Sequence, residues 1–282
     1  MTASIPAAVP SPASPALDRV PARTQDGPQA AGQFGILFVC TGNLCRSVIA
    51  ERLARRGLHA RLGADACRFR VASAGIAALD GCLVHPYTAE ALGRLGADAD
   101  GVVSHALTAD DVEAADLILT AGREHRDAVM AMRPGASRRA YLLREFARLA
   151  AVAPLGAPGR HAADISAAGG PASRAPGAER LGTEQGTERL GTAEPAAGHF
   201  AAGVTAAGCS AVDQARHLVA EAAQLRGLVP YVEAAEDEIA DPVSTSAAFL
   251  DCARTIDAAV SQALDAICRG LPGGHYRGKH AR

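Results

Sequence analysis

The chain of 282 residues has no tryptophan, and aromatic residues make up only 4% of it. Neither sign of charge is in excess, because 28 lysines and arginines are balanced by 30 aspartates and glutamates. Composition therefore gives no reason to expect nucleic acid or an anionic membrane surface as a partner. No apolar run approaches the ~20 residues that span a bilayer, so no membrane insertion is predicted.

The seven cysteines are widely spaced and odd in number, which indicates free thiols in a reducing compartment. No pairs of Cys or His stand at the spacing of a zinc site, so no metal is predicted. The first 33 residues are rich in Ala, Pro and Ser and lack the apolar core of a signal peptide. We therefore predict a disordered leader over 1–33 and a cytoplasmic protein.

Up to residue 150, strand-like and helix-like segments alternate, which indicates a parallel sheet. Residues 151–209 are instead dominated by Ala, Gly, Pro, Arg and Glu, and they repeat the motif Glu-Arg-Leu-Gly-Thr. Such a segment buries too little apolar surface to offset the entropy of ordering it. We predict one α/β domain from 34–150 plus about 210–270, a low-complexity insertion at 151–209, and a basic disordered tail at 271–282.

The individual elements are predicted from apolar periodicity and from Gly or Pro at their ends. Strands are expected at 35–39, 67–73 and 116–120, and residues 140–149 supply further apolar positions. Helices are expected at 48–56 (ended by Gly57), 86–95, after Thr108, at 123–132, 211–227 and 245–269.

The stretch 35–56 is predicted to form a strand, a short loop and a helix. The unpaired backbone N–H groups at the start of such a helix, together with the helix dipole, make an anion site that suits phosphate. Gly42 and Asn43 are residue types that tolerate left-handed backbone angles, so the loop can curl around an oxyanion. This stretch predicts a phosphate-binding loop.

Three side chains of this loop carry chemistry. Cys40 stands where the strand ends, and the field of the helix N-terminus favours its thiolate. The Arg46 guanidinium can bind two phosphoryl oxygens, and Ser47 can donate a hydrogen bond to the thiolate. Alone, Cys40 would be interpreted as a small core residue. Together, the three residues predict a thiolate nucleophile for phosphoryl transfer.

The segment VCTGNLCRSVIAE, residues 39–51, resembles the signature loop of the low-molecular-weight protein tyrosine phosphatases. The landmarks SAG, LGAD, LTADD, ADLILT and LLREF follow in the family's order, so the resemblance covers nearly all of 34–150. It implies a three-layer, doubly wound α/β fold with a four-stranded parallel sheet, and no metal or organic cofactor. The phosphate-binding residues that it implies beside Arg46 are Thr41, Gly42, Asn43, Leu44, Cys45 and Ser47.

Thiolate attack also needs an acid that protonates the leaving group and then activates water. Asp241 is the candidate, because Pro242 restricts the backbone directly after it and the pair precedes the last predicted helix. Asp-Pro in this place also resembles the family's general-acid motif. The neighbouring acidic residues 236–238 are predicted to be solvated loop charges.

Several positions depart from the family pattern. Val48 stands where members very often have proline, and Val102 where a histidine helps to hold the loop asparagine and serine. His105 is predicted to be exposed. Val243 and Ser244 stand where many members carry aromatic residues that flank the phosphotyrosine ring, so ring recognition is expected to be weaker or to come from elsewhere.

Cys45 lies inside the loop, near Cys40 in sequence. The resemblance implies a disulfide between the two that protects the nucleophile from irreversible oxidation. An inert loop thiol is the alternative.

Three functions stay open at this point. Hydrolysis of protein phosphotyrosine is favoured over phosphoarginine by Leu44, where the related arginine phosphatases carry threonine. An arsenate reductase on the same fold would need two further cysteines in the region of 121–134, which has none. A phosphate- or phosphoprotein-binding module with little turnover would not need Cys40 and Asp241 together. The resemblance implies a phosphorylated protein as substrate, with bacterial tyrosine kinases and their targets among the candidates.

Overall fold

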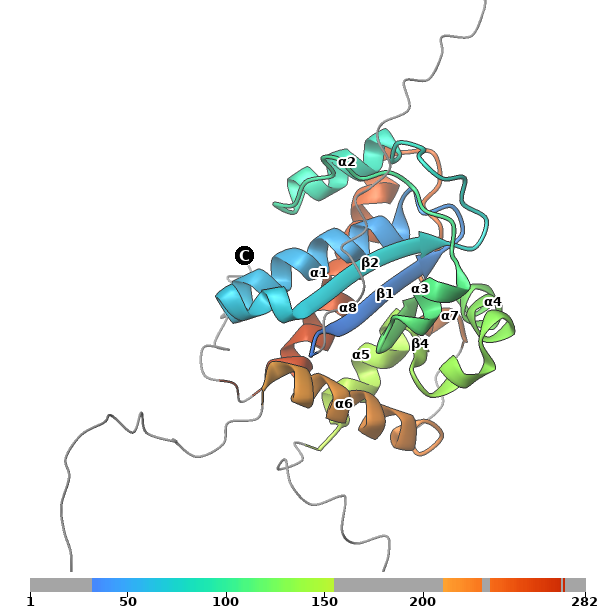
Figure 1. Ribbon diagram of the computed structural model, residues 1–282. Coiled ribbons are helices and arrows are strands. Elements are labelled where there is room, and N and C mark those ends of the chain that lie inside the picture. Colours follow the sequence, from blue (N-terminus) through green and yellow to red (C-terminus); the bar gives the residue numbers. More distant parts are fainter. Residues whose placement is uncertain (1–31, 155–209, 230–233, 270, 272–282) are drawn as a thin grey trace, which may run out of the picture.

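Four parallel strands form the centre of the molecule (Figure 1). They are β1 (Phe34–Cys40), β2 (Phe69–Gly75), β3 (Leu117–Thr120) and β4 (Ala140–Leu142), in the spatial order β2-β1-β3-β4. All three neighbouring pairs are parallel. The predicted four-stranded parallel sheet is therefore confirmed.

The computed structural model describes residues 32–154, 210–229, 234–269 and 271. Residues 1–31 of the predicted leader, 155–209 of the predicted insertion and 272–282 of the predicted tail lie outside these ranges. Within them, no helix has both the length and the apolar character to cross a bilayer. The helices are α1 (Arg46–Leu62), α2 (Pro86–Arg94), α3 (Ala109–Glu113), α4 (Arg123–Met132), α5 (Leu143–Val152), α6 (Ala211–Leu225), α7 (Ala234–Asp237) and α8 (Ser246–Ile267).

The alternation of side chains along β1 divides the core into two layers. Ile36 and Phe38 point into the larger cluster, which α1, α5, α6 and α8 cover. Leu37 and Val39 point into a smaller cluster on the other face, which includes residues of α3 and α4. Strands whose two faces are both buried are typical of a doubly wound fold, and this explains the unbroken apolar run at 35–39.

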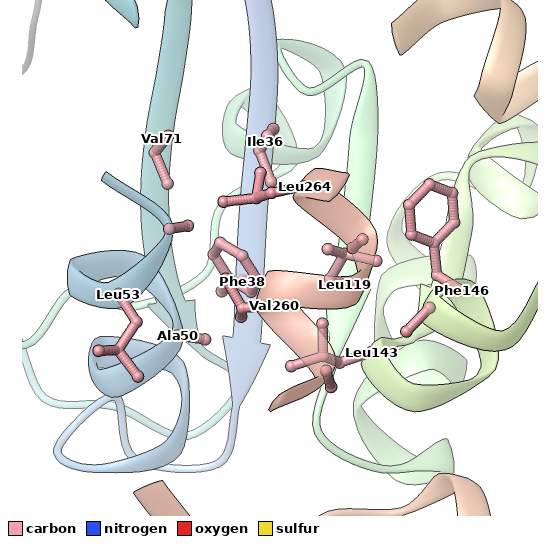
Figure 2. Packing of buried hydrophobic residues seen from close by; sticks show 14 of the residues in the cluster. Ile36, Phe38, Ala50, Leu53, Val71, Leu119, Leu143, Phe146, Val260 and Leu264 are labelled. Atoms are coloured by element: carbon pink, nitrogen blue, oxygen red, sulfur yellow. The ribbon is translucent and has the colours of Figure 1, made fainter. Parts of the chain in front are cut away.

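The long helix α8 crosses the larger face. Val260 and Leu264 of α8 lie against Ile36 and Phe38 of β1 (Figure 2). Two ion pairs join α8 to α1: Arg56 to Asp257 at 2.9 Å, and Arg61 to Asp265 at 2.7 Å. Residues about 200 positions apart in sequence therefore lie side by side on α1 and α8.

The predicted end of the first helix at Gly57 is wrong, because α1 continues to Leu62. Gly57 lies at the contact with α8, where an added Cβ would come within 2.6 Å of Leu264 Cδ1. The glycine allows the two helices to approach closely and does not stop α1. Strand β4 was not predicted either, since its three residues are too few to show a period.

Candidate active site

The predicted phosphate loop lies between β1 and α1, at the carboxyl edge of the sheet. Cys40 is the last residue of β1, and Cys45 is the N-cap of α1, which begins at Arg46. Asn43 adopts the left-handed backbone (φ 52°), whereas Gly42 is not among the residues with positive φ. Ligands of open α/β sheets bind at this edge, so the loop has the position that an anion site needs.

Cys40 belongs to a chain of buried hydrogen bonds. Its Sγ lies 2.9 Å from Ser47 Oγ, and Ser47 Oγ accepts a hydrogen bond from Asn43 Nδ2, also at 2.9 Å. All three residues are at most 2% exposed. Because Ser47 Oγ already accepts from the asparagine amide, its own proton is free to point at the sulfur. The arrangement fixes the position of Cys40 Sγ relative to Ser47 and Asn43.

Asn43 is held from two sides. Its Oδ1 accepts from the backbone N–H of His105 at 2.8 Å, and its Nδ2 also donates to Ser73 Oγ at 2.9 Å. Ser73 in turn donates to the buried carboxylate of Glu51. Val102, which stands where the family has histidine, is a core residue. Asn43 therefore does not depend on a histidine at that position.

His105 is less exposed than predicted. Its side chain is only 26% exposed, with Nε2 2.9 Å from Asp111 Oδ2 and Nδ1 3.5 Å from Asp80 Oδ1. These contacts fix the segment whose backbone N–H binds Asn43. The residue thus contributes to the site through its main chain.

Arg46 links the loop to the segment that carries Asp241. It is 7% exposed, and its Nε lies 3.0 Å from Asp241 Oδ1. Its Nη1 donates to the Ile239 carbonyl and its Nη2 to Thr41 Oγ1, both at 3.2 Å. Asp241 itself is 72% exposed. The structure thus brings Cys40, Arg46 and Asp241 to one site, with the carboxylate open to solvent.

His125 was missed in the sequence and lies beneath this site. Its side chain is fully buried on α4, with Nε2 3.0 Å from Thr41 Oγ1. Burial and the charge of Arg46 lower the pKa of His125. The same Nε2 lies 3.3 Å from Glu124 Oε1, so His125 connects Thr41 of the loop to a carboxylate at the start of α4. No sequence motif marks this histidine, because it comes from a helix 84 residues beyond the loop.

A cavity of about 420 Å³ opens beside Arg46. It is lined by Thr41 and Arg46 from the loop region, by residues 121–124, and by residues 238–241. The acidic segment before Asp241 is not simply solvated, because Asp237 forms an ion pair with Arg148 at 2.8 Å and is only 16% exposed. That ion pair anchors α7 on α5, next to the residues that line the cavity.

Aromatic side chains also lie next to the loop. The Leu44 carbonyl accepts from the His85 backbone N–H at 3.1 Å and from Thr88 Oγ1 at 3.0 Å. The His85 ring stacks on Phe249 of α8 at 4.5 Å between centroids, and Tyr87 meets Phe249 edge-on at 5.6 Å. Tyr87 is 37% exposed, so part of its ring is accessible. These rings come from α2 and α8 and had not been predicted.

Cys45 and Cys40 are both free thiols in this structure. The predicted disulfide between them is therefore not formed here, and Cys45 stays a candidate for redox chemistry.

The family model described as low molecular weight phosphotyrosine protein phosphatase matches residues 35–158. The probable low-molecular-weight protein-tyrosine-phosphatase EpsP of Ralstonia solanacearum is 34% identical over 111 residues, covering 39% of this chain and 71% of EpsP. The corresponding phosphatase Etp of Escherichia coli K12 is 38% identical over 102 residues, covering 35% of this chain and 62% of Etp. A protein-arginine-phosphatase of Bacillus subtilis is 37% identical over 94 residues, covering 33% of this chain and 59% of that protein.

The tyrosine phosphatase AmsI of Erwinia amylovora aligns with 84% of this chain and 95% of its own, at 19% identity and a TM-score of 0.47. The YwlE arginine phosphatase of Geobacillus stearothermophilus aligns with 81% of this chain and 89% of its own, at 17% identity and a TM-score of 0.45.

Proposed function

The chain belongs to the low-molecular-weight protein-tyrosine-phosphatase family, and from that premise we propose that it hydrolyses protein phosphotyrosine through a phosphocysteine intermediate. One observation carries the proposal. Cys40 Sγ lies 2.9 Å from Ser47 Oγ at the end of β1, while Arg46 of the same loop is 3.0 Å from the carboxylate of Asp241. The three side chains to which we assign the roles of nucleophile, oxyanion ligand and acid thus lie at one edge of the sheet.

In the first step the Cys40 thiolate attacks phosphorus, an S–P bond forms, and the bond from phosphorus to the substrate oxygen breaks. Backbone N–H groups of the loop and the Arg46 guanidinium stabilise the charge on the equatorial oxygens. Ser47 Oγ, 2.9 Å from Cys40 Sγ, holds the sulfur in position for attack. Protonated Asp241 gives its proton to the departing phenoxide.

In the second step Asp241, now a carboxylate, takes a proton from water. The resulting hydroxide attacks phosphorus, the S–P bond breaks, and the Cys40 thiolate leaves as phosphate is released. The exposure of Asp241 suits this role, because both the leaving group and the attacking water must reach it from solvent. Residues 238–241 border the cavity beside Arg46, which gives the substrate an approach to the loop.

Two features favour an aromatic phosphate ester as substrate. Leu44 offers an apolar side chain at the position where the related arginine phosphatases carry threonine. Tyr87 and His85 add a partly exposed ring surface, and the His85 backbone N–H donates to the Leu44 carbonyl. We propose that these rings replace the aromatic residues that are missing at Val243 and Ser244. The physiological substrate is then a tyrosine-phosphorylated protein, encountered in a reducing compartment such as the cytoplasm.

The test is hydrolysis of p-nitrophenyl phosphate under reducing conditions by the wild type, Cys40→Ser and Asp241→Asn. Cys67→Ser serves as the matched control, because Cys67 is an exposed free thiol in the turn before β2. We expect no turnover with Cys40→Ser, about 10²–10⁴-fold slower turnover with Asp241→Asn, and unchanged turnover with Cys67→Ser. Phosphotyrosine and phosphoarginine peptides, assayed side by side, test the substrate class.

Two outcomes would contradict the proposal. A folded wild type that binds phosphate or vanadate but turns nothing over would be a phosphate-binding module. Arsenate-dependent consumption of a dithiol reductant, without phosphatase activity, would make the protein an arsenate reductase.

A further inference from the structure

An ion pair behind the acid segment has no part in the mechanism described above. Arg148 of α5 donates from Nη2 to Oδ2 of Asp237, the last residue of α7, at 2.8 Å. The Asp237 carboxylate is 16% exposed and the Arg148 guanidinium 31%. Among the residues that the structure describes, Asp237 is the one hydrogen-bond partner of the Arg148 guanidinium. The pair therefore attaches the chain to α5 at a point just four positions before Asp241.

The neighbouring acidic residue is attached less firmly. Glu238 Oε1 lies 3.9 Å from Arg123 Nε and accepts from the Arg123 backbone N–H at 3.4 Å. Both side chains are more than 40% exposed, and exposed ion pairs at such distances contribute little to stability. The Arg148–Asp237 pair is shorter and better shielded from water, so it is the stronger of the two attachments.

The position of Asp241 during catalysis depends on the backbone that carries it. Its carboxylate is 72% exposed and lies 3.0 Å from Arg46 Nε. In the proposed mechanism the phosphoryl oxygens of the substrate compete for that same guanidinium. The contact with Arg46 is therefore weakest when the acid is needed, and the chain before Asp241 must then hold it in place.

Two attachments determine the course of this chain. One is Ile239, a buried core residue whose N–H donates to the Ala121 carbonyl at 2.8 Å. The other is Asp237, two positions earlier. A segment that is attached at one point can turn about it, whereas two points fix its direction. Without Arg148, the Asp237 carboxylate would lose its cation in a place that is mostly shielded from water, and it would turn out to solvent.

We propose that Arg148 is a positioning residue for the general acid, because by holding Asp237 it keeps the Asp241 carboxyl at the leaving-group oxygen. This role rests on the proposed function. As the S–P bond forms and the bond from phosphorus to the substrate oxygen breaks, Asp241 gives its proton to that oxygen. An acid displaced by about 1 Å slows this step by up to about 10²-fold, and only for leaving groups that need the proton.

The attachment is tested first without reference to catalysis, by amide hydrogen exchange followed by NMR. Arg148→Met keeps the apolar stem of the side chain and removes its charge. The Ala121 amide, which donates to the Val39 carbonyl at 2.9 Å, serves as the internal reference. We expect the ratio of the Ile239 exchange rate to the Ala121 exchange rate to rise about tenfold or more in Arg148→Met. An unchanged ratio would overturn the proposal.

Arg56→Met is the matched control for both tests. Arg56 forms an ion pair of similar length, 2.9 Å, with Asp257, and this pair joins α1 to α8 away from the acid segment. The variant should leave the ratio of the two exchange rates unchanged. If it raised the ratio as much as Arg148→Met does, the effect would come from general destabilisation and the proposal would fail.

The effect on catalysis is measured as kcat/KM for two aryl phosphates. Phenyl phosphate releases a phenol like that of tyrosine, whereas 2,4-dinitrophenyl phosphate releases a weakly basic phenoxide that departs without a proton. We expect Arg148→Met to lower kcat/KM about 10–100-fold for phenyl phosphate and less than about threefold for the dinitrophenyl ester. Arg148→Lys, which keeps a cation, should restore much of the loss, and Arg56→Met should not distinguish the two substrates.

A double-mutant cycle separates positioning from a structural role. Asp241→Asn alone should slow phenyl phosphate more than the dinitrophenyl ester, and adding Arg148→Met to it should cost nothing further. Equal losses for both substrates in Arg148→Met, or additive losses in the double variant, would overturn the positioning role. A wild type that hydrolyses neither ester would instead refute the phosphatase assignment, while the exchange rates would still decide whether Arg148 holds the segment.

Discussion

Replacing Gly75 with alanine probes how the sheet supports the phosphate loop. Gly75 ends β2 and pairs with Cys40 of β1. An added Cβ would lie 2.6 Å from the Thr41 carbonyl oxygen and 2.8 Å from the Asn43 backbone nitrogen. Both are backbone atoms of the loop, so no side-chain rotation can relieve the overlap.

The size of the effect follows from these distances. Ordinary contacts of a Cβ begin at about 3.4 Å, so the loop or β2 must move by about 0.8 Å. Such overpacking costs about 1–3 kcal/mol, equivalent to a fall in Tm of about 2–12 °C for a domain of this size. A shift approaching 1 Å in the groups that hold the phosphoryl oxygens costs up to about 100-fold in rate. We expect kcat/KM to fall about 10–100-fold in Gly75→Ala.

The assay measures kcat/KM with p-nitrophenyl phosphate and thermal unfolding of the same preparations. Gly35→Ala is the matched control, because its Cβ would lie 2.6 Å from the Ala114 carbonyl at the opposite end of β1. It should lose comparable stability and keep its activity. Gly93→Ala, with nothing within 4 Å of the added Cβ, should be neutral or slightly stabilising. If Gly75→Ala and Gly35→Ala had equal activity per folded molecule, the loop would not rest on β2 as described.

Three further predictions follow from the site. Ser73→Ala removes a hydrogen bond from each of Asn43 and the buried carboxylate of Glu51. We expect the free energy of unfolding in urea to fall by about 1–3 kcal/mol and kcat to decrease. An unchanged urea midpoint would contradict this. The pKa of His125 lies below its ordinary 6.5, so near and below that pH the unfolded chain binds more protons than the folded chain, and the free energy of unfolding falls as the pH is lowered. His125→Gln should flatten this slope in unfolding experiments from pH 5 to 8, and an unaltered slope would assign it to other groups. Tyr87→Ala should raise KM several-fold for phosphotyrosine peptides and leave it unchanged for a small alkyl phosphate, whereas equal changes for both would refute a role in ring binding.

Local signals predicted much of the fold. Thr108 caps α3 in a capping box, and Thr245 caps α8, as the side-chain types at these positions indicate. Pro86 begins α2, and the left-handed Gly96 follows its end. Each of these features depends only on a residue and its neighbours within one turn, so the sequence alone is sufficient to predict them.

Other features depend on partners far away in the chain. Glycine often ends a helix, yet Gly57 lies within α1, where its lack of a side chain leaves room for Leu264. The loop from Cys40 to Ser47 is contiguous, and its chemistry could be predicted as one motif. His125 and Cys252 reach the same site from α4 and α8, and neither stands in a recognisable pattern. Only the folded chain places His125 beside Thr41 and Cys252 beside the Ala240 carbonyl.

The contact between α1 and α8 also has a consequence for synthesis on the ribosome. Arg46 and the Ile239 carbonyl that it binds are 193 positions apart. At about 5–20 residues per second, roughly 10–40 s pass between the appearance of the loop and that of its partner segment. During this interval β1 and α1 lack the helix that covers them, and the nascent loop lacks Asp241, the acid that we propose. Activity therefore begins only after α8 has been synthesised and has packed against α1, so the enzyme is inactive while it is being translated.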